Sequence, residues 1–163
     1  MSRWRAMTKD DLAAAKAVAD RVHTEHPEDE AVFADRLQIH PEGCRVMEAD
    51  GAIAAYILSH PWRAFSPPQL NSVLGCLPEA PDTYYIHDIA LLPQLRGTGA
   101  AVEMVEAVAK HAADIGLRTI SLVAVNGSAG FWRSRGFRQI EDPAMAETLA
   151  SYGGGVFMIR DAR

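Results

Sequence analysis

The chain has 163 residues, of which 48% are hydrophobic and 23% charged, and its formal net charge is −5. That length suits one domain, over residues 1–163, which buries roughly two thirds of its unfolded surface. The acidic balance argues against a nucleic-acid partner, which would favour a basic face. No uncharged apolar run approaches the roughly 18 residues of a membrane span, and no apolar leader follows Met1, so we expect a cytoplasmic protein with no membrane partner.

The cysteine content is low. Cys44 and Cys76 lie far apart and form no C-x-x-C pattern. The sequence therefore indicates neither a disulfide framework nor a zinc site, and we expect no metal.

Two helices are predicted near the N-terminus. Thr8 can cap the first, in which apolar residues recur at helical spacing from Leu12 to Val22. The second is shorter, over Glu30–Ile39, and ends before His40-Pro41 because a residue that precedes proline disfavours helical geometry. The connection between them, His23–Glu30, is rich in carboxylates.

A β-hairpin is predicted next. The β-like runs Cys44–Ala49 and Ala52–Ser59 flank Asp50-Gly51, a strong hairpin signal, so they should pair antiparallel. The stretch Pro61–Asp82 is proline-rich and has no clear period, which predicts a long loop able to cover a site.

Strands and helices alternate in the second half of the chain. The predicted elements are a strand at Tyr84–Leu92, a helix at Gly99–Ile115, a strand at Thr119–Val125, a short helix at Ala129–Arg135, a strand from Phe137 and a last strand at Val156–Arg160. This order predicts a mixed α/β sheet with a parallel βαβ core around strands 84–92 and 119–125.

A glycine-rich turn joins the strand 84–92 to its helix. Glycine lets the backbone approach an anion closely, and the free N–H groups of a helix's first turn point at it. We interpret the turn as a diphosphate cradle with Arg96 adding charge; alternatively, glycine merely solves a steric problem there. The backbone amides expected to line the cradle are those of Gly97, Thr98, Gly99, Ala100, Ala101 and Val102. A P-loop lysine and a complete Rossmann fingerprint are both missing.

Two segments carry a resemblance to a known family. Ile89–Ala101 resembles motif A of the GNAT superfamily of acetyl-CoA-dependent N-acetyltransferases, with Arg96, Gly99 and Ala101 at the pattern positions. Asn126–Phe137 resembles motif B. The resemblance covers nearly the whole chain and implies a GNAT-like fold, a mixed, mostly antiparallel sheet of about six to seven strands with about four helices.

The resemblance implies direct transfer of acetyl from acetyl-CoA, the cosubstrate, to a primary amine of a small molecule or amino acid in a ternary complex. A protein amino group as acceptor and a catalytically silent CoA-binding module are the alternatives, and a homodimer is compatible with the family. The backbone of Ile89, Ala90 and Leu91 would pair with the pantetheine arm, and the Leu91 amide would polarise the thioester. Asn126 and the Phe131-Trp132 pair would flank the cofactor.

His87 is the candidate general base, since its position resembles a histidine assigned that role in arylalkylamine acetyltransferases. Its alternative role is that of a hydrogen-bonded sheet histidine. Strand alternation places Tyr85 on its face and Asp88, expected to be structural, on the other. Trp132 stands where the family often has a tyrosine acid, and indole does not titrate. Two alternatives remain: Tyr152 supplies the acid instead, or the thiolate leaves without one.

The acceptor site is expected among the loops. Glu25 and His26, in the acidic connection, could attract a cationic amine. The alternative is a solvated, charged turn with no role in binding. Trp62 could wall the acceptor, and Tyr85 could contact it. The sequence does not choose among possible amines.

Overall fold

A computed structural model describes residues 3–163, which form a seven-stranded sheet in the order β1-β2-β3-β4-β5-β7-β6. The strands are β1 (Trp4–Ala6), β2 (Cys44–Ala49), β3 (Ala52–Trp62), β4 (Thr83–Leu91), β5 (Thr119–Ala124), β6 (Arg138–Gln139) and β7 (Val156–Asp161). The α-helices are α1 (Leu12–Val22), α2 (Glu30–Ile39), α3 (Ala100–Asp114), α4 (Ala129–Ser134) and α5 (Ala146–Ser151). Only β4 and β5 pair in parallel, so the predicted mixed sheet with one βαβ core is confirmed.

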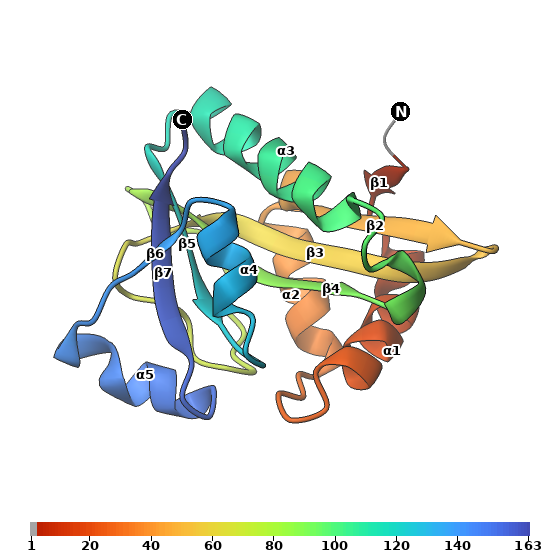
Figure 1. Ribbon diagram of the computed structural model, residues 1–163, viewed down its shortest axis with the longest axis horizontal. Helices are drawn as coiled ribbons and strands as arrows, with labels where there is room; N and C mark the ends of the chain where they lie inside the picture. Colours follow the sequence, from red (N-terminus) through yellow and green to blue (C-terminus); the bar gives the residue numbers. More distant parts are fainter. Residues whose placement is uncertain (1–2) are drawn as a thin grey trace.

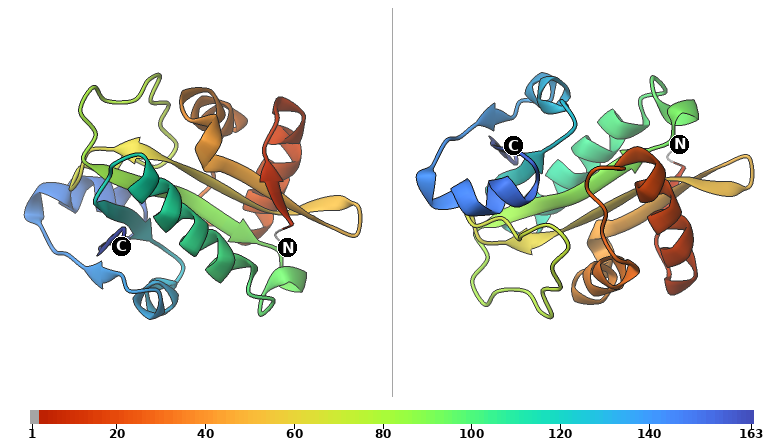
Figure 2. Two further views of the ribbon diagram at one scale, coloured as in Figure 1. Left: turned by 90° about the horizontal axis from the view of Figure 1, so that it is seen from above. Right: turned by 90° about the horizontal axis from the view of Figure 1, so that it is seen from below.

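The helices lie in two layers around the sheet. Helix α3 covers one face, whereas α1, α2 and α5 lie on the other (Figures 1 and 2). Tyr84 of β4 points toward His111 of α3, and Tyr56 of β3 packs its ring 5.3 Å from that of Phe33 in α2, so apolar side chains from both faces of the sheet form the core. Among residues 3–163, no helix is long and apolar enough to cross a bilayer.

Two details differ from the sequence prediction. Strand β3 continues past Ser59 to Trp62, so the loop before β4 starts later than expected. Pro61 is tolerated there because this end of β3 pairs only with β4: the pairing with β2 ends where Cys44 faces Leu58. Helix α5 was not predicted; it has only six residues and follows a 3-10 turn at Pro143–Met145.

Strands β4 and β5 separate soon after they meet. They pair only where Tyr84–Ile86 face Ile120–Leu122, although β4 runs on to Leu91. The edge of β4 from residue 87 onward therefore has no strand partner on the side of β5.

A β-bulge lies in β4 at the point of separation. Leu58 of β3 faces Asp88, but the next residue, Ser59, faces Ile86, which leaves His87 as the extra residue. The bulge breaks strand alternation, so His87 and Asp88 both face the layer of α1 and α2. The expectation that Asp88 points to the opposite face from His87 is wrong for this reason.

Candidate active site

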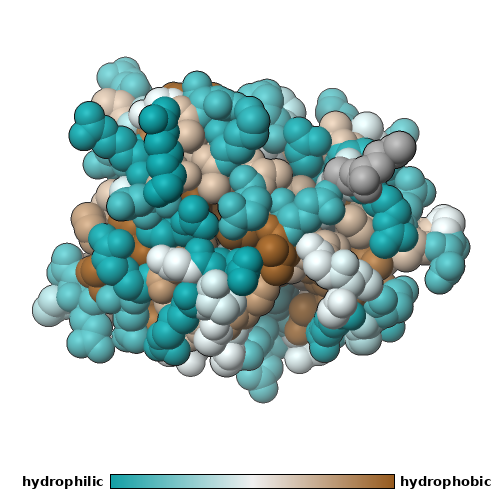
Figure 3. Space-filling model, turned by 45° about the horizontal axis from the view of Figure 1, so that its top comes forward, coloured by the Kyte–Doolittle hydropathy of each residue, from teal (hydrophilic) through white to brown (hydrophobic). Residues whose placement is uncertain are grey.

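A cavity of about 590 Å³ opens where β4 and β5 part. Figure 3 shows a hollow with apolar side chains on a largely hydrophilic face. Most of the residues singled out from the sequence line this cavity: His26, His87, Ile89, Ala90, Leu91, Arg96, Gly97, Gly99, Ala100, Ala101, Val102, Asn126, Phe131, Trp132 and Tyr152. The fold thus gathers the cradle, the free edge of β4 and the turn after β5 around one space.

The turn before α3 has the geometry of an anion cradle. Gly97 and Gly99 adopt φ angles of 77° and 85°, a left-handed conformation that favours glycine. Amides in the first turn of α3 lack helical acceptors and point along its dipole, which suits a diphosphate. Thr98 does not line the cavity: its backbone N–H and its hydroxyl both donate to the Leu95 carbonyl, at 3.4 and 2.6 Å.

The free edge of β4 suits the pantetheine arm of CoA. Its backbone groups border the cavity, and an extended chain that carries amides can pair with them as an added strand would. Trp132 closes this end: it is 5% exposed, and its ring packs against Phe131 and Phe137 at centroid distances of 5.1 and 5.3 Å. It acts as an apolar wall.

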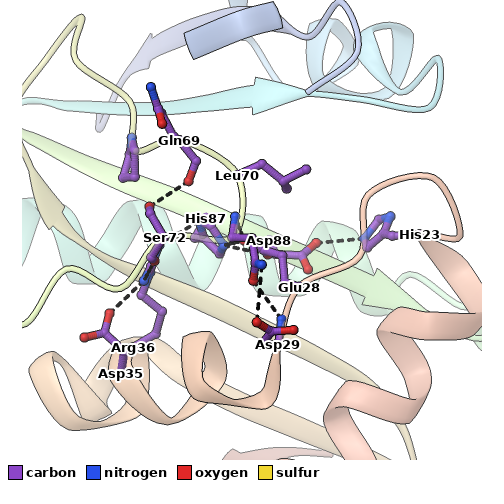
Figure 4. A network of polar contacts seen from close by, with 12 residues as sticks. His23, Glu28, Asp29, Asp35, Arg36, Gln69, Leu70, Ser72, His87 and Asp88 are labelled. Carbon is purple, nitrogen blue, oxygen red and sulfur yellow. Dashed lines mark hydrogen bonds and ion pairs between the residues drawn. The ribbon is translucent and has the colours of Figure 1, made fainter. Parts of the chain in front are cut away.

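His87 is enclosed by charged partners (Figure 4). Its Nε2 lies 2.8 Å from Glu28 Oε1, and its Nδ1 lies 3.5 Å from Nη2 of Arg36. A guanidinium always stays protonated, so the Arg36 N–H is the donor and Nδ1 of His87 is the acceptor. The ring proton of His87 is therefore on Nε2, which donates it to Glu28. The His87 side chain is 1% exposed, and both of its nitrogens are occupied within the protein.

Glu28 forms the acidic side of this cluster. Burial raises the pKa of its carboxyl group, but His87 and the hydrogen bond donated by the Asn71 N–H outweigh burial and leave that pKa below its usual value. Glu28 is therefore an ionised carboxylate in the cavity wall.

The buried cation of Arg36 contacts His87 on the side away from Glu28. Arg36 donates to Asp35 at 2.7 Å and to the Ser72 carbonyl at 2.8 Å. Asp35 in turn accepts from the N–H groups of Leu74 and Gly75. These contacts fix the long loop 63–82 to α2.

A second carboxylate–imidazole pair lies next to the first, because Asp88 directly follows His87 in β4. Asp88 Oδ1 is 2.8 Å from Nε2 of His23, the residue that ends α1, and its Oδ2 accepts a hydrogen bond from the buried Tyr56 hydroxyl. Nδ1 of His23 lies 3.0 Å from the side-chain nitrogen of Asn126. Burial raises the pKa of Asp88, but the His23 and Tyr56 contacts lower it overall. Burial lowers the pKa of His23, and Asp88 raises it above its usual value.

Several residues predicted for substrate or acid roles occupy other positions. Glu25 is exposed, Trp62 donates its indole N–H to the Ser66 carbonyl, and Tyr85 is buried; none of them lines the cavity. Tyr152 lines it, but its hydroxyl donates to the Pro68 carbonyl at 2.8 Å. His26 also lines the cavity, with Nε2 2.8 Å from the Tyr152 carbonyl.

Three titratable residues of the cavity had no assigned catalytic or binding role in the sequence analysis: His23, Glu28 and Asp88. Glu28 belongs to the acidic connection that the sequence did mark, so its position was indicated but not its identity. His23 begins the same connection and Asp88 was expected to be structural, but nothing in the sequence indicated that the two pair, because their meeting depends on the bulge. Within residues 3–163, no cluster of three or more His, Cys, Asp or Glu side chains is arranged to hold a metal ion.

Comparison with known proteins identifies the family. Residues 5–137 match the model of the acetyltransferase (GNAT) family, which covers most of the chain. The protein therefore belongs to the GNAT family of acyltransferases, and the resemblance seen in the sequence is confirmed. No curated protein matched the chain significantly.

Solved structures share the fold over nearly the full chain. The GNAT-like decarboxylase GphF, solved with isobutyryl-CoA, has a TM-score of 0.78 at 18% identity and covers 99% of this chain and 100% of its own. Rv2747 from Mycobacterium tuberculosis, solved with CoA and NLQ, has a TM-score of 0.70 at 17% identity, with coverages of 97% and 98%. The ribosomal-protein-S18-alanine N-acetyltransferase from Escherichia coli has a TM-score of 0.65 at 18% identity, with coverages of 99% and 94%. At these identities the likeness shows the fold alone.

Proposed function

We propose that the protein is an N-acetyltransferase that moves the acetyl group of acetyl-CoA to a primary amine of a small molecule or amino acid, by direct attack in a ternary complex. The observation that carries this proposal is that two carboxylates with lowered pKa values, Glu28 and Asp88, line the same cavity as the anion cradle. Carboxylates in a partly enclosed cavity attract an ammonium group. They disfavour an anionic acceptor for the same reason.

The chemistry needs few groups besides those already in place. The cradle at Gly97–Val102 would hold the diphosphate, and the amide of Leu91 would polarise the thioester carbonyl. An amine that has lost its proton attacks that carbonyl, a new C–N bond forms, and the C–S bond breaks. The thiolate is a sufficiently good leaving group that Trp132, which cannot titrate, is compatible with turnover.

Hydrogen bonds between loops favour a small acceptor over a protein chain. The connection between α1 and α2 meets the turn after α5 through His26 and the Tyr152 carbonyl, and Tyr152 meets the loop 63–82 at Pro68. Leu70 of that loop lines the cavity. Three segments thus surround the part of the cavity lined by His26, Leu70 and Tyr152, which we call the acceptor end, and they restrict the size of the molecule that can enter.

A panel of amines tests the proposal. With acetyl-CoA and a suitable amine, thiol release should saturate in both substrates, and Arg96→Glu combined with Gly99→Glu should abolish both CoA binding and turnover. Parallel assays with propionyl- and succinyl-CoA measure the acyl preference. Tight acetyl-CoA binding by calorimetry without turnover of any amine or amino-terminal peptide would support the silent module instead. Turnover of peptides alone would move the acceptor to a protein amino group.

A further inference from the structure

We propose that His23, held by Asp88, takes the proton from the attacking amine, and that His87 positions Glu28 without exchanging protons with the substrate. This inference rests on the proposed acetyl transfer to an amine. It reverses the expectation from the sequence, which assigned the base role to His87.

His23 is placed at the open end of the separated strands. It caps α1, with its backbone N–H bonded to the Ala19 carbonyl, so its ring starts from a fixed point. The ring reaches across to Asp88 of β4 on one side and to Asn126, which follows β5, on the other. Figure 4 shows it approaching Asp88 from the side opposite Arg36. Both Asp88 and Asn126 line the cavity.

The partners of the His23 ring define its reactive atom. When the ring is neutral, the Nε2 proton faces the Asp88 carboxylate, and Nδ1 keeps a lone pair that accepts from the Asn126 amide. Asn126 lies in the wall along which the cofactor would run. A bound amine can replace that amide as the partner of Nδ1, whereas Nε2 stays at ion-pair distance from Asp88 Oδ1, 2.8 Å away.

Asp88 is itself held in place, which makes the pair a base with its orienting group. Its second oxygen accepts from Tyr56, whose side chain is fully buried, so the carboxylate has little freedom to turn away. An imidazole oriented by a carboxylate on its far nitrogen is the arrangement by which enzymes fix the tautomer of a general base. The charged or polar groups that face His23 are Asp88, Glu28, the Ile89 backbone and the Asn126 amide, and the first three favour the protonated ring.

His87 lacks the features that His23 has. Its side chain is 1% exposed, compared with 14% for His23. Its Nδ1 faces the guanidinium of Arg36 at 3.5 Å, which occupies that nitrogen. Its Nε2 proton is committed to Glu28. No nitrogen of His87 is therefore free to accept a proton.

The step balances with the groups on hand. The amine nitrogen forms a bond to the acetyl carbon, its proton passes to Nδ1 of His23, and the C–S electron pair leaves with the thiolate. The imidazolium then returns the proton to the thiolate or to solvent, which regenerates the neutral base.

Three variants of the full chain test the inference: His23→Gln, His87→Gln and Asp88→Asn, with His111→Gln as a matched control on the opposite face of the sheet. His23→Gln should lower kcat about 100-fold or more while the calorimetric Kd of acetyl-CoA is unchanged. It should also remove the acid limb of kcat/KM against pH, which Asp88→Asn shifts to lower pH. His87→Gln should lose less activity and keep the acid limb.

The readouts separate the possible failures. Wild-type turnover that His23→Gln leaves intact, with the acid limb lost in His87→Gln, overturns this inference and leaves the proposed function standing. Absence of amine turnover in the wild type overturns the proposed function itself. NMR titration of the imidazoles gives a reading without turnover: the pKa of His23 should exceed that of His111 and fall in Asp88→Asn, and an unchanged pKa there would contradict the pairing.

Discussion

Arg36 and His87 meet in the interior: Nη2 of the guanidinium lies 3.5 Å from Nδ1 of the imidazole, and the Arg36 side chain is 0% exposed. A fully buried permanent cation is costly unless it is paired, and here Asp35 pairs with it. The two residues therefore link the stability of the protein to the arrangement of its site. Arg36 holds the loop 63–82 on one side, and on the other it determines which nitrogen of His87 carries the ring proton.

Removal of Arg36 should destabilise the protein strongly. Arg36→Met leaves Asp35 as a buried charge with only two backbone donors, and the expected loss in the free energy of unfolding is about 3–5 kcal/mol. Urea denaturation measures it. Asp35→Asn combined with Arg36→Met should recover part of the loss, because it removes the unpaired charge. Additive effects of the two substitutions would contradict the pairing.

Glu28→Gln should weaken binding of the amine and leave binding of acetyl-CoA unchanged. The neutral amide keeps the size of the side chain but loses the charge that attracts an ammonium group, so we expect the KM of the amine to rise about 10-fold at low salt. The KM of acetyl-CoA should change little. Steady-state kinetics at two ionic strengths measure the effect. A rise in the KM of acetyl-CoA instead would place Glu28 in the cofactor site.

Tyr152→Phe tests the restriction at the acceptor end. The change deletes the hydroxyl that donates to the Pro68 carbonyl at 2.8 Å, which leaves a buried acceptor unsatisfied and should cost about 1–3 kcal/mol of unfolding free energy. The loop 63–82 loses one of its ties, so kcat/KM should improve for bulky amines relative to small ones. If Tyr152 were instead the general acid, kcat would fall equally for every amine.

The sequence predicted the parts of the fold that local rules determine. Asp50-Gly51 specified the hairpin, and the apolar period of residues 12–22 specified α1, because turn chemistry and helical spacing act over a few residues. The cradle was readable for the same reason. The pairing of Asp88 with His23 was not, because it depends on a bulge opposite Leu58 and Ser59 that only the paired strands reveal. Glu28 lies within the acidic connection 23–30, but the sequence does not show which carboxylate of that connection turns inward, because that depends on the contact with His87.

The His23–Asp88 pair should make stability depend on pH in two windows. The pKa of Asp88 is lowered in the folded state, so its contribution is present above the usual pKa of about 4 and is lost as pH falls through the folded value. The pKa of His23 is raised, so its contribution is present below about 6.5 and is lost as pH rises through the folded value. Chemical denaturation from pH 3 to 9 measures both windows. Asp88→Asn should remove the upper one, and a wild-type profile that is flat near neutral pH would contradict the shift in His23.

The two cysteines should differ sharply in reactivity. Cys44 is fully buried, and burial raises the pKa of its thiol to about 12, so almost no thiolate forms at neutral pH. Cys76 is exposed in the loop 63–82. A chromogenic disulfide reagent at pH 8 should label one thiol per chain rapidly, and the second only when urea unfolds the protein. Cys76→Ser should abolish the fast phase, whereas Cys44→Ala should leave it intact. Rapid labelling of both thiols in native conditions would show that β2 opens far more readily than its burial implies.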